Sequence, residues 1–109
     1  MRQYSVGNTL AANVKTTVYT VPTGYYALWK LCYVVNTTGN NKTINVWWYD
    51  KSTTSEIVVV GSYSIAHTDF LRFDGGAYVV LEEGDEIRLQ SELGSTMNAI
   101  NTFEVIRKA

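Results

Sequence analysis

Apolar and polar residues alternate along most of the chain, so that apolar side chains recur at every second position. This period is that of a β-strand, whose successive side chains point to opposite faces of a sheet. No stretch of helical length repeats apolar residues at intervals of three and four, so we expect no crossover helices and mostly antiparallel pairing. The predicted strands span residues 14–21, 25–36, 42–50, 56–65 with a break near Gly61, 70–73, 77–81, 86–90 and 98–106.

Turn-forming residues separate these strands. Pro22 fixes φ near the value needed at the second position of a turn, and Gly24 accepts a positive φ, so the chain is expected to reverse here. Gly84 and Asp85 mark a second turn, and glycine accompanied by Asn, Asp or Ser marks others at 37–41, 74–76 and 92–95. About eight short strands this closely spaced indicate an all-β fold, a single antiparallel β-sandwich.

The same pattern sets the expected domain organisation. Residues 14–109 are predicted to form the β-sandwich domain, and residues 1–13 an N-terminal arm or first edge strand. Val and Thr make up 26 of the 109 residues and aromatic residues another 13%, a composition that favours pleated, half-buried surfaces over helices. The composition therefore supports the all-β prediction independently of the periodicity.

Alternation within the strands assigns their faces. In the strand at 25–36 the odd-numbered residues are expected to face the core: Ala27, Trp29, Leu31, Tyr33 and Val35. In the strand at 42–50 one face is expected to carry Ile44, Val46 and Trp48, and the other Thr43, Asn45, Trp47 and Tyr49. A core about 10 Å thick does not hold all the aromatic side chains. Those left over either contact another protein, stack on sugars, or are buried in the monomer by sheet curvature and the N-terminal arm.

Charge and cysteine content exclude several classes of protein. The chain has 9 basic and 10 acidic side chains, a net charge of -1, and no basic patch that would neutralise a row of phosphates, which argues against nucleic-acid binding. Cys32, the single cysteine, rules out an intrachain disulfide and suits a reducing cytoplasm as a small buried hydrophobe. No apolar run has the length of a signal peptide or membrane span, so we expect a soluble protein without an export signal.

Residues with catalytic or ligand-binding chemistry are sparse. His67, the single histidine, has Ser64 and Asp69 nearby in sequence, but a triad must converge through the fold. One histidine and one cysteine exclude the usual zinc sites. The acidic run at 82–86 lacks the ligand spacing of a calcium loop and is interpreted as a solvated turn, and the glycines match no phosphate-binding pattern. The chain is expected to be no enzyme and to use no cofactor or metal.

Four segments carry a resemblance to a known family. Residues 17–24, 36–39, 79–87 and 101–105, in this order, make the chain similar to the small β-sandwich virion proteins of tailed bacteriophages. The resemblance extends from about Thr16 to Val105 and consists of turn and strand-edge signatures. It implies a jelly-roll-like subunit, often a homotrimer, that acts as a head decoration or cement protein or as a tail or fibre component.

The resemblance and the residues together give three functional hypotheses. The first is a non-enzymatic capsid decoration or cement subunit, which is located in the virion after assembly in the bacterial host cytoplasm. Its partners would be major capsid or tail proteins and further copies of itself, with a trimer favoured. The expected interface residues are Arg2, Tyr4, Tyr25, Tyr26, Trp47 and Tyr49.

The second hypothesis is a tail or tail-fibre component whose β-sandwich reads a receptor glycan. Trp47, Tyr49 or Trp29 would serve as the stacking platforms. The third is a hydrolase, which requires His67 to lie in a cleft with an acidic partner and a nucleophile.

Overall fold

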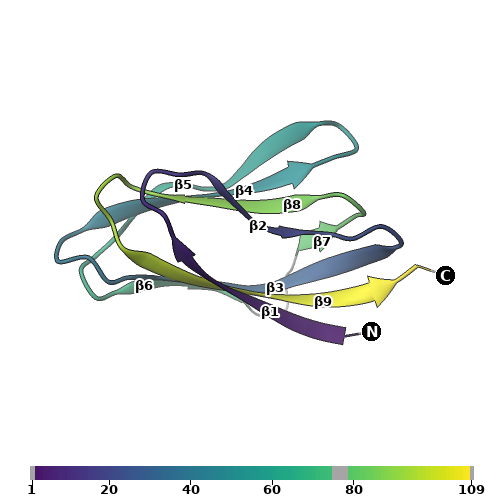
Figure 1. Cartoon of the computed structure of the whole chain (residues 1–109), viewed down its shortest axis with the longest axis horizontal. Helices are drawn as coiled ribbons and strands as arrows, with labels where there is room; N and C mark the ends of the chain where they lie inside the picture. The colour runs from purple at the N-terminus through teal and green to yellow at the C-terminus, as the bar shows by residue number, and fades with distance from the viewer. Residues whose placement is uncertain (1, 75–78, 109) are drawn as a thin grey trace.

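Two antiparallel β-sheets face each other across the core of the computed structural model, which describes residues 2–74 and 79–108 (Figure 1). The larger sheet has the order β1-β9-β3-β6, with β7 also pairing with β3: β1 (Arg2–Leu10), β9 (Met97–Arg107), β3 (Tyr25–Asn36), β6 (Phe70–Phe73) and β7 (Val79–Leu81). The smaller sheet has the order β2-β8-β4-β5: β2 (Thr16–Thr20), β8 (Glu86–Ser91), β4 (Lys42–Asp50) and β5 (Ser55–Ile65). The prediction of an antiparallel β-sandwich is confirmed.

The strand boundaries follow the turns that the sequence marks. Strands β3, β4 and β6 begin and end at the predicted residues, and β9 is one residue longer at each end than predicted. The described residues contain one strand more than the eight that were predicted. This additional strand is β1, which pairs with β9 from Arg2 to Leu10 and forms an edge of the larger sheet. Gly75, Gly76 and Ala77, parts of a predicted turn and strand, lie outside the described residues.

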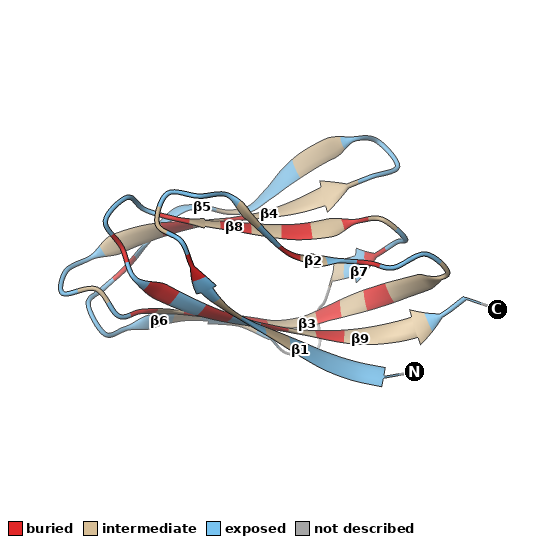
Figure 2. Cartoon of the chain, viewed as in Figure 1, coloured by how far each residue is buried: buried red, intermediate tan, exposed pale blue. Residues whose placement is uncertain are grey.

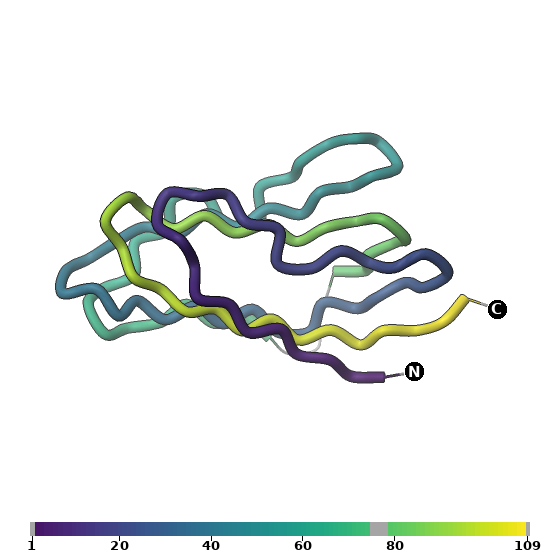
Figure 3. The backbone as a smooth tube through the Cα atoms, viewed as in Figure 1, coloured from purple at the N-terminus to yellow at the C-terminus, as the bar shows by residue number. Residues whose placement is uncertain are grey.

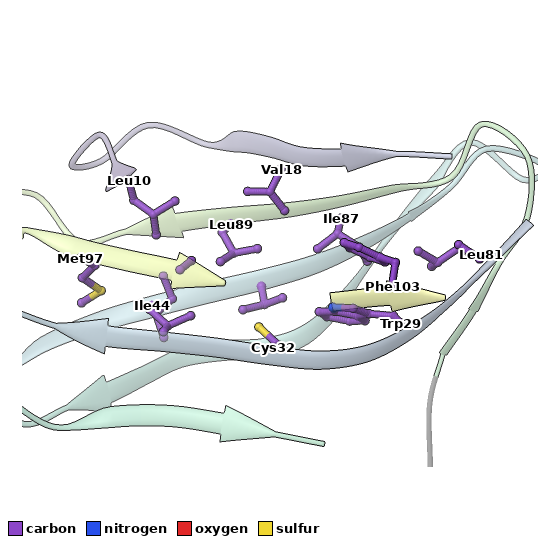
Figure 4. Packing of buried hydrophobic residues seen from close by; sticks show 14 of the residues in the cluster. Leu10, Val18, Trp29, Cys32, Ile44, Leu81, Ile87, Leu89, Met97 and Phe103 are labelled. Carbon is purple, nitrogen blue, oxygen red and sulfur yellow. The ribbon is translucent and has the colours of Figure 1, made fainter. Parts of the chain in front are cut away.

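The core lies between the sheets and is filled by aliphatic and aromatic side chains from both. Phe103 of β9, Ile44 of β4 and Ile87 of β8 are fully buried, and Trp29 of β3 is 3% exposed. Figure 2 shows the buried positions recurring along the facing strands, and Figure 4 shows these side chains pointing toward one another between the sheets. The predicted inward face of β4 is confirmed, because Ile44 and Val46 are buried and Trp48 packs against the core.

The prediction for β3 is correct for its first half and wrong for its second half. Ala27 and Trp29 face the core, but beyond them the buried residues are Cys32, Val34 and Asn36. The cause is a β-bulge: Trp29 pairs with Phe103 and Leu31 with Thr102, so Lys30 is an extra residue on this strand. A shift of one residue exchanges the two faces of a strand. Three residues expected in the core are therefore only partly buried: Leu31, Tyr33 and Val35.

A second irregularity replaces the break that was expected near Gly61. Strand β5 is continuous, but its pairing with β4 shifts between Tyr63, which lies opposite Ile44, and Val60, which lies opposite Val46. Ser62 has a positive φ of 47°, and its N–H donates to the side chain of Asn45 over 2.8 Å. The glycine-containing segment therefore bends the strand without ending it.

Candidate functional site

Three surfaces of the described residues gather aromatic or apolar side chains that are at least partly exposed. The first is a cleft whose lining includes Arg2 and Arg107, at the end of the sandwich. Figure 3 shows both termini of the chain at this end. The cleft has a volume of about 600 Å³ and is open to solvent. Its lining comes from β1, β2, β3, β9 and the turn before β3: Arg2, Tyr4, Tyr19, Thr20, Pro22, Tyr25, Val105 and Arg107. Three of the predicted interface residues thus meet here, namely Arg2, Tyr4 and Tyr25.

Two aromatic rings of the cleft lining lie beside each other, and one of them stacks on the core. Tyr19 stacks on the buried Phe103 with 4.1 Å between ring centroids, and Tyr4 lies 6.0 Å from Tyr19 in a tilted arrangement. Burial, and secondarily the neighbouring Tyr4, raises the pKa of the Tyr19 hydroxyl. Tyr19 therefore stays protonated at neutral pH and joins an apolar ring face to a polar hydroxyl.

The charged groups of the cleft lining are both positive. The guanidinium of Arg2 lies 5.6 Å from the centre of the Tyr4 ring, and Arg107 lies opposite Tyr25 in the pairing of β9 with β3. Neither arginine forms an ion pair with a carboxylate in the described part of the chain. Glu83, near this end, is not part of the lining, and its carboxylate accepts a hydrogen bond from the Gly24 N–H. The lining thus offers two cations to an anionic group.

The other predicted interface residues lie elsewhere. Tyr26 follows Tyr25 on β3 and therefore points to the opposite, outer face of the larger sheet, where it pairs with Ile106. Trp47 and Tyr49 lie on the outer face of the smaller sheet and are partly buried. The structure therefore divides the six expected residues among three faces instead of gathering them in one site.

The rings of Trp47 and Tyr49 are covered by cations of the same chain. Lys15 Nζ lies 4.1 Å from the centre of the Trp47 ring, and the guanidinium of Arg88 lies 4.2 Å from that of Tyr49. Glu56 ties the two cations together, at 2.8 Å from Lys15 and 2.9 Å from Arg88. The hydrogen bond from Lys15, and next that from Arg88, lowers the pKa of Glu56. Within the monomer, these aromatic residues already have polar partners.

The outer face of the larger sheet carries apolar side chains from β3, β6, β7 and β9. Tyr33 stacks with Phe70 at 5.2 Å between ring centroids, and Ile100 lies opposite Tyr33 in the pairing with β9. Phe70 is 48% exposed and Ile100 44%. Apolar side chains continue along this face on β3 and β7: Leu28, Leu31, Val35 and Val80. These four residues and the three named before them form one set of seven, which we call the outer apolar face: Leu28, Leu31, Tyr33, Val35, Phe70, Val80 and Ile100.

The sequence did not predict most of the residues that form the cleft and the outer apolar face, for two physical reasons. The bulge at Lys30 moves Leu31, Tyr33 and Val35 outward, and alternation alone does not locate a bulge. Tyr19 and Arg107 join the cleft only because β2 and β9 end beside β1, which depends on strand order. A signal for the cleft did exist, since Arg2 and Tyr4 stand two positions apart and so share a face of any strand.

The candidate catalytic residues do not converge. His67 Nδ1 donates to the carbonyl oxygen of Thr38 over 2.6 Å, and the Asp69 carboxylate accepts from the N–H of Phe70. Among the described residues no hydrogen bond joins His67 to Ser64 or Asp69, and no group of His, Cys, Asp and Glu is placed to hold a metal ion. The described residues also include no helix with the length and hydropathy needed to cross a membrane.

Comparison with known proteins places the fold but no family, because no family model and no curated protein matches the chain. A solved structure of Bacillus endospore appendages, described as disulfide-linked pili, shares 13% identity with a TM-score of 0.58, covering 99% of this chain and 87% of that one. The globular domain of zebrafish complement 1qA protein has 13% identity, a TM-score of 0.51 and 98% coverage of both chains. The cyanophage Pam1 capsid has 13% identity and a TM-score of 0.51, covering 94% of this chain and 82% of that one. At this identity the likeness concerns the β-sandwich fold.

Proposed function

We propose that the protein is a non-enzymatic structural subunit that assembles with copies of itself and acts as a capsid decoration or cement protein of a phage virion. The observation that carries this proposal is the outer apolar face. The larger sheet presents apolar side chains to the core on one side, and on the other it also carries the seven apolar side chains of this face, among which Phe70, Val80 and Ile100 are exposed. A set of neighbouring exposed apolar side chains is typical of a protein interface.

The structural neighbours support the same role at a coarser level. A pilus, a viral capsid and the complement domain are built on this β-sandwich, and the first two are structural assemblies by their descriptions. Within the described residues the side chains provide no converging catalytic group. We therefore assign the protein's activity to protein–protein contacts, with a homotrimer as the preferred assembly and the virion as its location.

A tail-fibre subunit that binds glycans through Trp47 and Tyr49 is the alternative. It has less support, because Lys15 and Arg88 occupy the ring faces on which a sugar would stack. A sugar would have to displace two cations that Glu56 holds in place.

The self-assembly proposal is tested by measuring the mass of the protein in solution with light scattering. The protein is expected to have three times the mass of one chain, and Ile100→Glu is expected to raise the dissociation constant at least about thirtyfold, because it places a charge in an apolar contact. Leu93→Glu is the matched control, since Leu93 is an exposed aliphatic residue in a turn outside this face. A monomeric parent protein, or equal effects of both variants, would contradict the proposal.

The location is tested separately with an antibody against the purified protein. Phage particles from the host strain that carries the gene are labelled and viewed by electron microscopy. Label on the heads is expected, label on the tails would favour the alternative, and particles without label would refute a virion role.

A further inference from the structure

The free edge of β1 runs beside the cleft at the end of the sandwich. β1 is the outermost strand of the larger sheet and, in the described part of the chain, pairs with β9 along one side only. An edge strand presents unpaired N–H and C=O groups that form a template for another strand. Proteins commonly block such edges with proline, lysine or several charges, but β1 contains no proline, and Arg2 is its one charged residue. The exposed first part of β1, which includes Arg2 and Tyr4, is therefore open to pairing.

The side chains of β1 next to the cleft set a spacing for any strand that is added. Arg2 and Tyr4 stand two positions apart on β1 and both line the cleft. Side chains of neighbouring strands lie opposite one another and alternate between faces. An added strand would therefore place two of its own side chains, also two positions apart, beside Arg2 and Tyr4.

The charge and lining of the cleft define those two side chains. Beside Arg2, with Arg107 entering the cleft from β9, the complementary group is a carboxylate, which arginine binds through paired hydrogen bonds. Beside Tyr4 the complementary group is apolar, since Tyr19 and Val105 line the same volume. We propose that the free edge of β1 and this cleft bind an extended acidic segment of a partner protein, with an acidic and an apolar residue two positions apart.

A second copy of this chain fits the cleft less well than a different partner. Among the described strands, the exposed edge strand β5 carries the required spacing at Glu56 and Val58. The carboxylate of Glu56 is already held by Lys15 and Arg88. Its use in the cleft would break both ion pairs, whereas a foreign acidic segment carries no such cost.

The inference is tested with synthetic peptides of about ten residues, blocked at both ends so that only side chains carry charge. One peptide has glutamate and valine two positions apart, the second has them adjacent at equal composition, and the third replaces glutamate by glutamine. Fluorescence anisotropy measures their binding to the untagged protein, because Arg2 and Arg107, close to the two ends of the chain, line the cleft. The first peptide is expected to bind at least about tenfold more tightly than either of the others.

Protein variants locate the binding site. Arg2→Gln and Arg107→Gln are each expected to weaken binding of the first peptide about tenfold. Arg72→Gln, the control, removes an exposed arginine of β6 whose guanidinium lies 3.7 Å from Asp74, and is expected to leave binding unchanged. Equal losses for all three variants, or equal binding of the peptides, would reduce the effect to general charge attraction and overturn the proposal.

Two further measurements separate strand pairing from other binding. Methylation of the peptide amides that face β1 is expected to abolish binding, and unchanged binding would overturn strand addition. Oligogalacturonate tests an acidic sugar in place of a peptide: tighter binding than the first peptide, lost in Arg2→Gln, would overturn the choice of a protein partner. If none of the peptides binds, the choice of a protein partner is overturned as well.

This inference rests on the proposed function because it takes the partner to be a protein. The two fail separately, because self-association through the outer apolar face is measured with Ile100→Glu and does not involve the cleft. A trimer that binds no peptide would refute the cleft assignment alone. A monomer that binds the acidic peptide would refute the trimer alone.

Discussion

The backbone N–H of Val21 donates a hydrogen bond to the carbonyl oxygen of Asp85 over 3.0 Å, and the N–H of Gly84 donates one to the carbonyl oxygen of Val21 over 3.0 Å. Two turns far apart in the sequence are therefore joined through their backbones. The Asp85 side chain is 1% exposed and accepts from Trp48 Nε1, the Lys51 N–H and the Glu82 N–H at 3.0–3.2 Å. The Asp85 carboxylate thus joins Trp48 of β4 and the turn that follows β4 to the turn before β8, and the backbone of Asp85 joins the turn at Val21.

Asp85→Ala is expected to lower the free energy of unfolding by about 3 kcal/mol, because it leaves three donors without an acceptor in or near the core. Urea denaturation followed by tryptophan fluorescence measures the loss. Asp74→Ala, which removes an exposed carboxylate paired with Arg72, is the control and is expected to change stability by less than about 0.5 kcal/mol. Similar losses for the two variants would show that the buried contacts of Asp85 contribute little.

Gly24→Ala isolates the effect of a backbone angle. Gly24 has a φ of 86°, and a Cβ added there would contact nothing within 4 Å, so the cost is conformational and not steric against neighbours. We expect a loss of about 1–2 kcal/mol in the free energy of unfolding. Gly39→Ala is the matched control, because Gly39 has equal space around it and no such angle. The two variants are compared by thermal denaturation, and equal stabilities would contradict the argument.

Turn chemistry explains why so much of the fold was predictable. Pro22, Gly24 and Gly84 act through local φ preferences, which belong to the residue and can be identified without knowing its neighbours. The strand boundaries around them follow for the same reason. The faces of β3 beyond Trp29 depend instead on one extra residue in the strand, Lys30, and the position of this bulge is decided by the pairing of β3 with β9. Pairing is a long-range property that alternation does not contain.

The candidate site shows the same division. Arg2 and Tyr4 share a strand face because of their spacing, so part of the cleft could be predicted from local sequence. Tyr19 and Arg107 reach it from β2 and β9, and no feature of the sequence places the ends of those strands beside β1. The Trp47 side chain was expected to remain exposed for a partner, but the structure places Lys15 over its ring. Lys15 and Trp47 are far apart in the sequence, so their contact depends on the fold.

Deletion of Lys30 is expected to preserve the fold. Removing the extra residue restores regular alternation while Trp29 and Cys32 keep facing the core. Deletion of Tyr33 is the control: it would turn Val34 and Asn36 outward and break the hydrogen bond from Asn36 Nδ2 to the Ile65 carbonyl oxygen. Circular dichroism during heating should show a cooperative transition for the first variant and none for the second. A folded Tyr33 deletion would refute the assignment of faces.

Ionisation of the buried Cys32 thiol is expected to lower the free energy of unfolding at alkaline pH. Burial raises the pKa of its thiol to about 12, from a reference value of 9.0. A raised pKa in the folded state means that this stability is complete below the reference value and is lost as the pH rises from about 9 to about 12. We expect the unfolding free energy of the parent protein to fall more steeply over this range than that of Cys32→Ala. Parallel curves in urea titrations would show that the thiol ionises equally in both states.

Native Cys32 is also expected to resist a thiol-specific disulfide reagent at pH 8, because the thiolate is the reacting form and is suppressed by burial. Adding urea should restore the reaction at the rate of a free thiol. Rapid reaction without urea would mean that β3 opens under native conditions.

The bulge at Lys30 also bears on the history of this fold. A gain or loss of three nucleotides inside a strand normally exchanges core and surface residues for the rest of that strand. Here the extra residue lies where the ladder can absorb it, so Cys32, Val34 and Asn36 keep their places. We therefore expect related genes to differ in length by one codon within this strand, and not only in the loops where insertions usually collect.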